Sequence, residues 1–349
     1  MRFHIQRAMS QAAYRAMVAV RMTPPRPSHH IRAVAAEPLL QMPYRATSCV
    51  MQAAIVALGF IVSLNVAMAK APEDQAKRFD YAKAITPALV GGTIVKAKCC
   101  NVTEWKLTSP EGEAIEVTVV DPLAKGKRPM VVWLHREGQE VKRAGFMQEA
   151  EALAAAGVAS LLVELPFKQP YAGGVGGVGG DPDSIVRAVV NARRTLDWAA
   201  TRPEFDIRKV AVVGHRFGAW AATLLAGVDD RIDAVLLMSP PGKPSGWLQV
   251  TEQPKAKAFR EGFDKAQWVA YLAAIEPLDP ERWIGFAAPA KVHFQFGSSD
   301  AWTQTLEQVD LFRAASSPKT RLMFDADELL NDEAKRDRFG WLKRVLTGK

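Results

Sequence analysis

Residues 210–222 read VAVVGHRFGAWAA and predict a strand, a tight turn and a helix in immediate succession. The first four residues are apolar, Gly214 and Gly218 flank the turn, and AWAA begins a helical run. Glycine on both sides lets the strand and the helix approach closely, so the middle residue of the turn projects from the sheet. That middle residue is Arg216. The residue that this turn projects is therefore positively charged.

Buried strands and helices are predicted to alternate around this stretch. Continuous apolar runs, typical of parallel strands covered on both faces, occur at residues 129–134, 158–165, 209–213, 234–238, 290–296 and 320–324. Helical patterns occupy residues 141–156, 183–201, 302–315 and 332–346. This alternation predicts an α/β fold with a mainly parallel central sheet and helices on both faces.

Two further segments modify that simple alternation. Residues 103–107 and 113–120 flank the turn sequence SPEG and predict an antiparallel N-terminal hairpin. Residues 239–289 are longer than an ordinary crossover and contain a predicted helix near residues 264–274. We expect this interval to form a lid or cap insertion within a single domain of residues 70–349.

Residues 1–69 have the composition of a leader. Residues 1–41 are an arginine-rich extension that we expect to be disordered, either a transit peptide or sequence upstream of a true start at Met42. Residues 42–69 combine Arg45, the apolar run 50–69 and the motif Ala67-Met68-Ala69, which is typical of a signal peptide. Cleavage after Ala69 predicts a periplasmic or secreted protein. An uncleaved 50–69 segment would instead be a signal anchor and the basis for stable membrane association.

Charge and cysteine content exclude several kinds of partner. The net charge is +8, but residues 1–69 carry seven arginines and one acid, and +8 minus +6 leaves +2 for the rest. A nearly neutral body does not predict a nucleic-acid-binding surface. Three cysteines without metal-ligand spacing predict no metal site, and we expect no cofactor. The glycine-rich residues 173–180 do not directly follow a strand, which favours a loop over a dinucleotide site.

The order of these landmarks resembles the α/β-hydrolase superfamily, especially its dienelactone-hydrolase-like and prolyl-oligopeptidase-like esterases and peptidases. The resemblance covers about residues 113–346. It rests on the glycine-flanked turn at Arg216, on the turn at His135 after an apolar strand, and on the G-x-x-D sequence that ends at Asp300. It implies an α/β-hydrolase fold with its site at the carboxyl ends of the parallel strands.

The same resemblance assigns catalytic positions, and this chain departs from the family at most of them. Members carry a serine nucleophile, then an acid, then a histidine base. The equivalent positions here are Arg216, Asp300 and Glu328, so only the acid is retained. In the oxyanion region, His135 is kept, Arg136 replaces an expected glycine, and Phe217 follows the nucleophile position. Arginine stays protonated and is a poor nucleophile and a poor base.

These departures predict a protein that has lost serine-hydrolase activity. A buried guanidinium needs partners, so we expect Arg216 to pair with Asp300 and Glu328, with Arg136 as a further candidate. The pocket could then bind a small anionic or acyl-type ligand through Arg136 and Arg216, or be purely structural.

Two other hypotheses stay open. One is an active esterase or peptidase that uses unconventional residues, such as Ser239 with His215 or His135 as base, although these positions are more typical of packing residues. The other is a non-catalytic interaction module. His293 lies inside a predicted strand and is expected to be a core or face residue.

Overall fold

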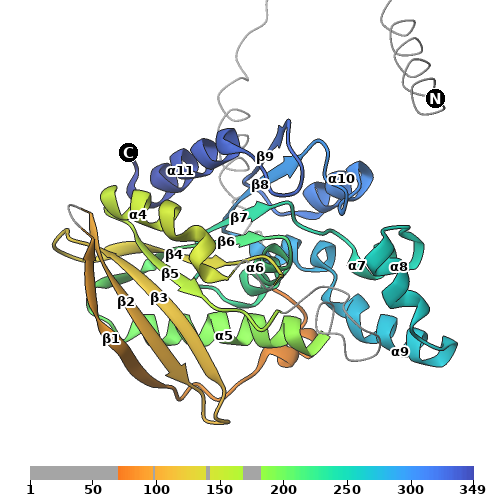
Figure 1. Cartoon of the computed structure of the whole chain (residues 1–349), viewed down its shortest axis with the longest axis horizontal. Coiled ribbons are helices and arrows are strands. Elements are labelled where there is room, and N and C mark those ends of the chain that lie inside the picture. The colour runs from red at the N-terminus through yellow and green to blue at the C-terminus, as the bar shows by residue number, and fades with distance from the viewer. Residues whose placement is uncertain (1–69, 97–98, 139–141, 168–181) are drawn as a thin grey trace, which may run out of the picture. The chain divides into compact units, whose positions relative to one another are not determined.

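The computed structural model describes residues 70–96, 99–138, 142–167 and 182–349. Within these ranges the strands form one nine-stranded sheet in the order β1-β2-β3-β5-β4-β6-β7-β8-β9 (Figure 1). The strands are β1 (Thr86–Lys96), β2 (Cys100–Thr108), β3 (Ala114–Pro122), β4 (Arg128–Leu134), β5 (Ala159–Val163), β6 (Phe205–His215), β7 (Ala234–Met238), β8 (Lys291–Gly297) and β9 (Lys319–Phe324).

The sheet is parallel from β5 to β9 and antiparallel at its N-terminal edge. The antiparallel pairs are β1–β2, β2–β3 and β3–β5, and the other neighbours run parallel. The predicted parallel strands and the predicted hairpin are therefore confirmed. Strand β1 was not predicted: it lies at the edge of the sheet, and Leu89 and Val90 are about half exposed.

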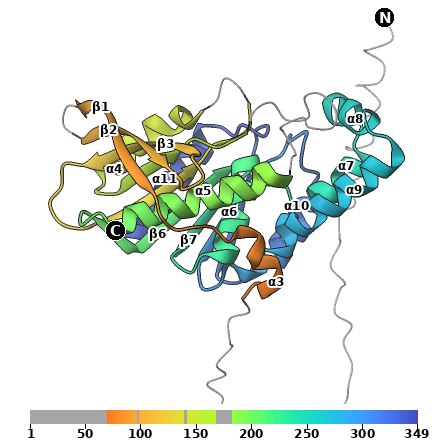
Figure 2. The same ribbon diagram turned by 90° about the horizontal axis from the view of Figure 1, so that it is seen from below.

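Helices cover both faces because side chains alternate along each buried strand. Met130, Val132 and Leu134 of β4 belong to the core under α5 and α6, whereas Val131 and Trp133 belong to the core under α4 and α11. Figure 2 shows α5 running along one face, beside α6. These helices are α4 (Met147–Ala155), α5 (Pro182–Ala200), α6 (Phe217–Val228) and α11 (Asp332–Thr347).

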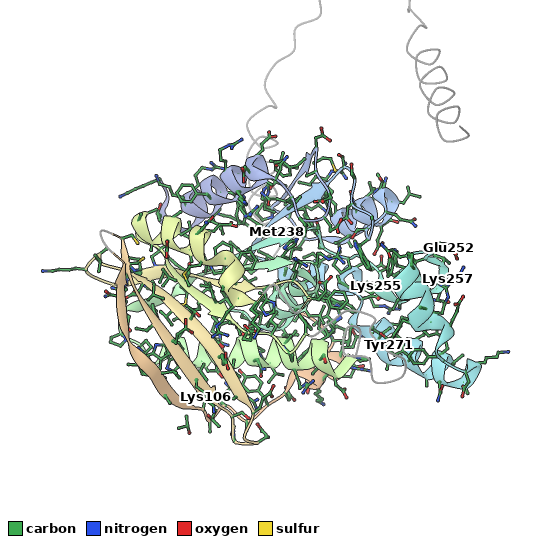
Figure 3. The ribbon with its side chains drawn as sticks, in the orientation of Figure 1. Lys106, Met238, Glu252, Lys255, Lys257 and Tyr271 are labelled. Atoms are coloured by element: carbon green, nitrogen blue, oxygen red, sulfur yellow. The ribbon has the colours of Figure 1, made fainter. Side chains whose placement is uncertain are left out.

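The predicted insertion at residues 239–289 is built of short helices. It contains α7 (Pro244–Val250), α8 (Pro254–Glu261), α9 (Lys265–Ile275) and three 3₁₀ turns, η3 (Glu276–Leu278), η4 (Pro280–Arg282) and η5 (Ile284–Ala287). A capping box between Asp264 and Gln267 begins α9, close to the predicted start. In Figure 3, Met238 lies near the middle of the molecule, whereas Lys257 and Tyr271 lie on the side formed by α8 and α9.

The remaining elements complete the two ends of the domain. Helix α3 (Glu73–Ala76) and the turn η1 (Lys77–Phe79) precede the sheet, η2 (Arg143–Phe146) leads into α4, and α10 (Thr305–Ala314) joins β8 to β9. The predicted leader, residues 1–69, and the glycine-rich residues 173–180 lie outside the described residues. In the part of the chain that is described, no helix is long and apolar enough to cross a membrane.

Candidate functional site

Arg216 occupies a strained turn between β6 and α6. Its backbone has φ 52° and ψ −111°, a region that residues with a side chain rarely adopt. The two flanking glycines are required by close approach: a Cβ at Gly214 would lie 2.3 Å from the Gly218 carbonyl oxygen, and one at Gly218 would lie 2.0 Å from the Leu134 carbonyl oxygen. The sequence prediction of a tight, projecting turn agrees with this geometry.

The Arg216 side chain forms a buried ion pair with Glu137. Its Nε donates to Glu137 Oε1 at 2.6 Å, and the two side chains are only 7% and 3% exposed. The guanidinium carbon also lies 4.6 Å from the centre of the Trp302 ring, a cation–π arrangement. Arg216 is thus held by one carboxylate and one aromatic face.

The sequence prediction that Asp300 and Glu328 pair with Arg216 is wrong in its partners. The reason is the sheet order. Glu137 follows β4, which is the direct neighbour of β6, whereas Asp300 and Glu328 follow β8 and β9, which lie farther along the sheet. Sequence reasoning missed Glu137, although an acid in the strand-end turn HREG was a visible signal.

Asp300 serves the backbone of its own loop. Its Oδ1 accepts hydrogen bonds from the Trp302 N–H at 2.8 Å and the Thr303 N–H at 3.1 Å. Its Oδ2 is buried and has no hydrogen-bond partner among the described residues. Burial raises the pKa of Asp300, the nearby charge of Arg216 opposes that rise, and Glu328 adds to it. The three positions are therefore electrostatic neighbours without forming a triad-like chain of hydrogen bonds.

Both histidines near the turn are engaged by backbone groups. His135 Nε2 accepts the Leu165 N–H at 2.9 Å, so the proton lies on Nδ1, which donates to the Arg136 carbonyl oxygen at 2.7 Å. His215 Nε2 donates to the Glu328 carbonyl oxygen at 2.8 Å. Burial lowers the pKa of both rings, to about 3 for His215.

The backbone donor that follows the turn residue is occupied by the same carboxylate. The Phe217 N–H donates to Glu137 Oε2 at 3.2 Å. One carboxylate therefore bridges the Arg216 side chain and the Phe217 backbone. Arg136 does not join this bridge with its charge: its Nη1 donates to the Glu137 main-chain oxygen at 3.3 Å.

Ser239 has the second unusual backbone in this region. It directly follows β7, has φ 44°, and is 1% exposed. Its Oγ has no hydrogen-bond partner among the described residues, so neither His135 nor His215 activates it. The neighbouring Met238 carbonyl oxygen accepts the Arg216 N–H at 2.9 Å, which places Ser239 beside the turn.

A small pocket with a cavity volume of about 20 Å³ opens beside Arg216. It is lined by Arg216, Phe217, Ser239, Pro241, Pro244, Trp247, Trp302, Thr303 and Glu307. Four of these residues, Ser239, Pro241, Pro244 and Trp247, come from the 239–289 interval, so that interval supplies one wall. Arg136, which the sequence placed in the site, is not among the lining residues.

His293 lies outside this pocket, on β8. It is 3% exposed, and its two ring nitrogens lie 2.7 Å from Thr320 Oγ1 and 2.7 Å from Asp337 Oδ2. Its ring stacks on Trp341 of α11. This agrees with the expected role as a strand residue on one face of the sheet. Within the described ranges, no group of three or more histidine, cysteine or acidic residues could hold a metal ion.

Comparison with known proteins identifies the architecture. No family model matches the sequence, and no curated protein matches it. Among solved structures, acetyl xylan esterase 1 from Thermoanaerobacterium sp. JW/SL YS485 is similar, with a TM-score of 0.66 at 15% identity over 80% of this chain and 95% of that one. The acetyl xylan esterase from Paenibacillus sp. R4 has a TM-score of 0.64 at 18% identity, over 77% of this chain and 92% of that one.

A third similar structure is 2,6-dihydroxy-pseudo-oxynicotine hydrolase, with a TM-score of 0.55 at 16% identity over 71% of this chain and 68% of that one. At sequence identities this low, the structural similarity establishes the fold only, and the chemistry has to be argued from the residues of the site. The strand order, the glycine-flanked turn and these structural neighbours lead to one conclusion: this chain has the fold of the α/β-hydrolase superfamily.

Proposed function

We propose that this chain is an α/β-hydrolase-fold protein that has lost serine-hydrolase chemistry. The observation that carries the proposal is the buried Arg216–Glu137 pair at the turn, because it alters two parts of the catalytic apparatus together. Acyl transfer needs a nucleophile and donors for the oxyanion of the tetrahedral intermediate. Arg216 supplies no nucleophile, and the Phe217 N–H already donates a hydrogen bond to Glu137.

The hydrogen bond from the Phe217 N–H to Glu137 is a second obstacle to catalysis, in addition to the missing serine. In this fold, the backbone N–H after the nucleophile is one of the donors to the developing oxyanion. A carboxylate that already accepts from the Phe217 N–H leaves an anion where a second negative charge would have to form. Electrostatic repulsion then opposes the transition state that an esterase must stabilise.

The positional assignment of the lost triad rests on the same geometry. Arg216 stands at the turn, Asp300 follows β8, and the Glu328 backbone contacts His215 next to the turn. We assign these as the nucleophile, acid and base positions, with His135, Arg136 and Phe217 in the oxyanion region. The alternative of an active hydrolase would require Ser239 to act without a histidine in contact with its hydroxyl.

The proposal includes the location inferred from the sequence. The apolar run 50–69 and the Ala67-Met68-Ala69 motif support export to the periplasm or the medium, with cleavage after Ala69. N-terminal sequencing of the protein recovered from periplasmic and membrane fractions tests this. A mature N-terminus at Lys70 supports cleavage, whereas intact residues 50–69 in the membrane fraction support a signal anchor.

An activity-based fluorophosphonate probe tests the loss of chemistry. The wild-type protein should remain unlabelled and should not hydrolyse p-nitrophenyl acetate above the buffer rate. Ser239→Ala is the control, since Ser239 is the serine that lines the pocket. Labelling of the wild type that disappears in this variant would refute the proposal and establish Ser239 as a nucleophile.

A gain-of-function variant tests the positional assignment. Combining Glu137→Gly, Arg216→Ser and Glu328→His frees the Phe217 N–H and restores serine and histidine together. Probe labelling at residue 216 in this variant, with none in the parent, supports the assignment. The variant that keeps Glu137 is the matched control, and it should label more slowly because the carboxylate still opposes the oxyanion.

A further inference from the structure

Two side chains in the pocket keep hydrogen-bond donors that no other described residue accepts from. Arg216 uses Nε for Glu137, and its two terminal nitrogens have no hydrogen-bond partner in the part of the chain that the structure describes. The Ser239 hydroxyl is also unpartnered, although this residue is 99% buried. Both side chains line the same small pocket. Buried polar groups are normally satisfied, so the Ser239 hydroxyl points to a ligand with an acceptor oxygen, and the Arg216 terminal nitrogens offer further donors at the same pocket.

The charges around the pocket select among such ligands. The charge of Arg216 is already balanced by Glu137 at 2.6 Å. Glu307 lines the pocket, and Asp300 lies close enough to Arg216 for the charge of the guanidinium to lower its pKa. A second anion at the Arg216 terminal nitrogens would therefore meet two or three carboxylates with one guanidinium to offset them. An uncharged acceptor keeps the hydrogen bonds and avoids both the repulsion and the desolvation of a charge.

The remaining walls are apolar and limit size. Phe217, Pro241, Pro244, Trp247 and Trp302 supply rings that surround the donors. The Trp247 and Trp302 rings lie 5.8 Å apart, tilted by 38°. The cavity itself is small, about 20 Å³, far below the roughly 300–1,000 Å³ of ordinary ligand sites. Only a compact group, such as a carbonyl with a short acyl chain, can enter it, not a long chain or a sugar.

The strained backbone of Ser239 supports a built site. A non-glycine residue with φ 44° is uncommon, and strain of this kind persists where the surrounding structure enforces it. Its N–H donates to the Gln295 carbonyl oxygen at 2.8 Å, which fixes the turn from the next strand. The backbone is therefore locked while the hydroxyl is left without an internal partner.

From these observations we infer that the pocket binds a small uncharged carbonyl compound, such as a short-chain amide or ketone, whose oxygen accepts hydrogen bonds from Arg216 and Ser239. The inference rests on the proposed loss of hydrolysis, since a retained ligand must not be cleaved. Of the anionic and acyl-type ligands expected from the sequence, it selects the acyl type.

Fluorine NMR with two probes of the same shape tests the inference. Trifluoroacetamide and trifluoroacetate share a trifluoromethyl group and a carbonyl carbon but differ in charge. With the full-length protein at neutral pH, trifluoroacetamide should bind with a Kd about tenfold below that of trifluoroacetate. Ser239→Ala should weaken amide binding about three- to tenfold, the size expected for one lost hydrogen bond.

Ser316→Ala is the matched control. The Ser316 hydroxyl is likewise buried and unpartnered but does not line the pocket, so amide binding should be unchanged. Ser239→Gly is the second variant in case alanine disturbs the fold, because glycine adopts a positive φ readily. Unchanged amide binding in both Ser239 variants would overturn the role of this residue.

The remaining outcomes separate this inference from the proposed function. Equal or tighter binding of trifluoroacetate would overturn the preference for an uncharged ligand. Binding of neither probe would overturn the inference while leaving the loss of hydrolase chemistry untouched. Conversion of trifluoroacetamide to trifluoroacetate in the spectrum would instead refute the proposed function itself.

Discussion

Removing the acid that holds Arg216 is the sharpest test of the site. Glu137→Ala leaves a guanidinium that is 7% exposed without its carboxylate, and it deprives the Phe217 N–H of its acceptor. Breaking a buried ion pair by deleting one partner typically costs about 3–5 kcal/mol. The cation–π contact with Trp302 is present in both proteins, so it cancels in the comparison. We expect a loss of about 3–5 kcal/mol in the free energy of unfolding.

Urea unfolding monitored by tryptophan fluorescence measures this loss as a shift of the transition midpoint. The partner variant Arg216→Met and the double variant complete a thermodynamic cycle. The double variant should be more stable than Glu137→Ala, because no unpaired charge remains buried. Asp310→Ala is the control, since its pair with Arg313 is largely exposed and should contribute less than about 1 kcal/mol.

A destabilisation by Glu137→Ala no larger than that of the surface control would refute the reasoning. Such a result would mean that Arg216 turns outward to water when its partner is removed. The pair would then be a surface-like contact and would not explain the blocked N–H of Phe217.

Three further predictions concern burial and close approach. His215 should stay neutral at pH 5 in a ¹H–¹⁵N spectrum, because burial lowers its pKa to about 3. Since the pKa in the unfolded chain is higher, the free energy of unfolding should fall as pH drops from about 6.5 toward 3, and His215→Gln should remove that dependence. Burial raises the pKa of Asp279 to about 6, so its protonated form stabilises the fold at low pH, and that contribution is lost as pH rises through about 4 to 6. In Asp279→Asn, the midpoint of urea unfolding should change less with pH across this window. Gly218→Ala should prevent folding or cost several kcal/mol, roughly the range of severe strain, because its Cβ would lie 2.0 Å from the Leu134 carbonyl oxygen. Gly340→Ala in α11 meets only a flexible arginine end at 3.3 Å and should stabilise slightly, by about 0.4–1 kcal/mol, as measured by thermal denaturation.

The local pattern of residues was enough to predict most of the sheet. Strands β4, β5, β7 and β8 are short apolar runs that are almost entirely buried, so their composition alone marks them. Strand β1 carries no such signal: it contains a proline and two glycines, and a register shift falls between Val90 and Ile94. An exposed edge strand is recognised by its pairing with β2, which sequence periodicity does not encode.

The sequence by itself determined the turn at Arg216, and it was the source of the predicted departures at Glu328 and Arg136 and of the proposal of lost hydrolase chemistry. The close approach of strand and helix requires glycine at positions 214 and 218, so the turn can be predicted from the sequence alone. The partner of Arg216 was decided only by the tertiary structure. Glu137 lies 79 positions away in the chain, and it reaches the guanidinium because β4 pairs directly with β6. Strand order is set by packing of the whole sheet, so it decides which of several acids neutralises a buried cation.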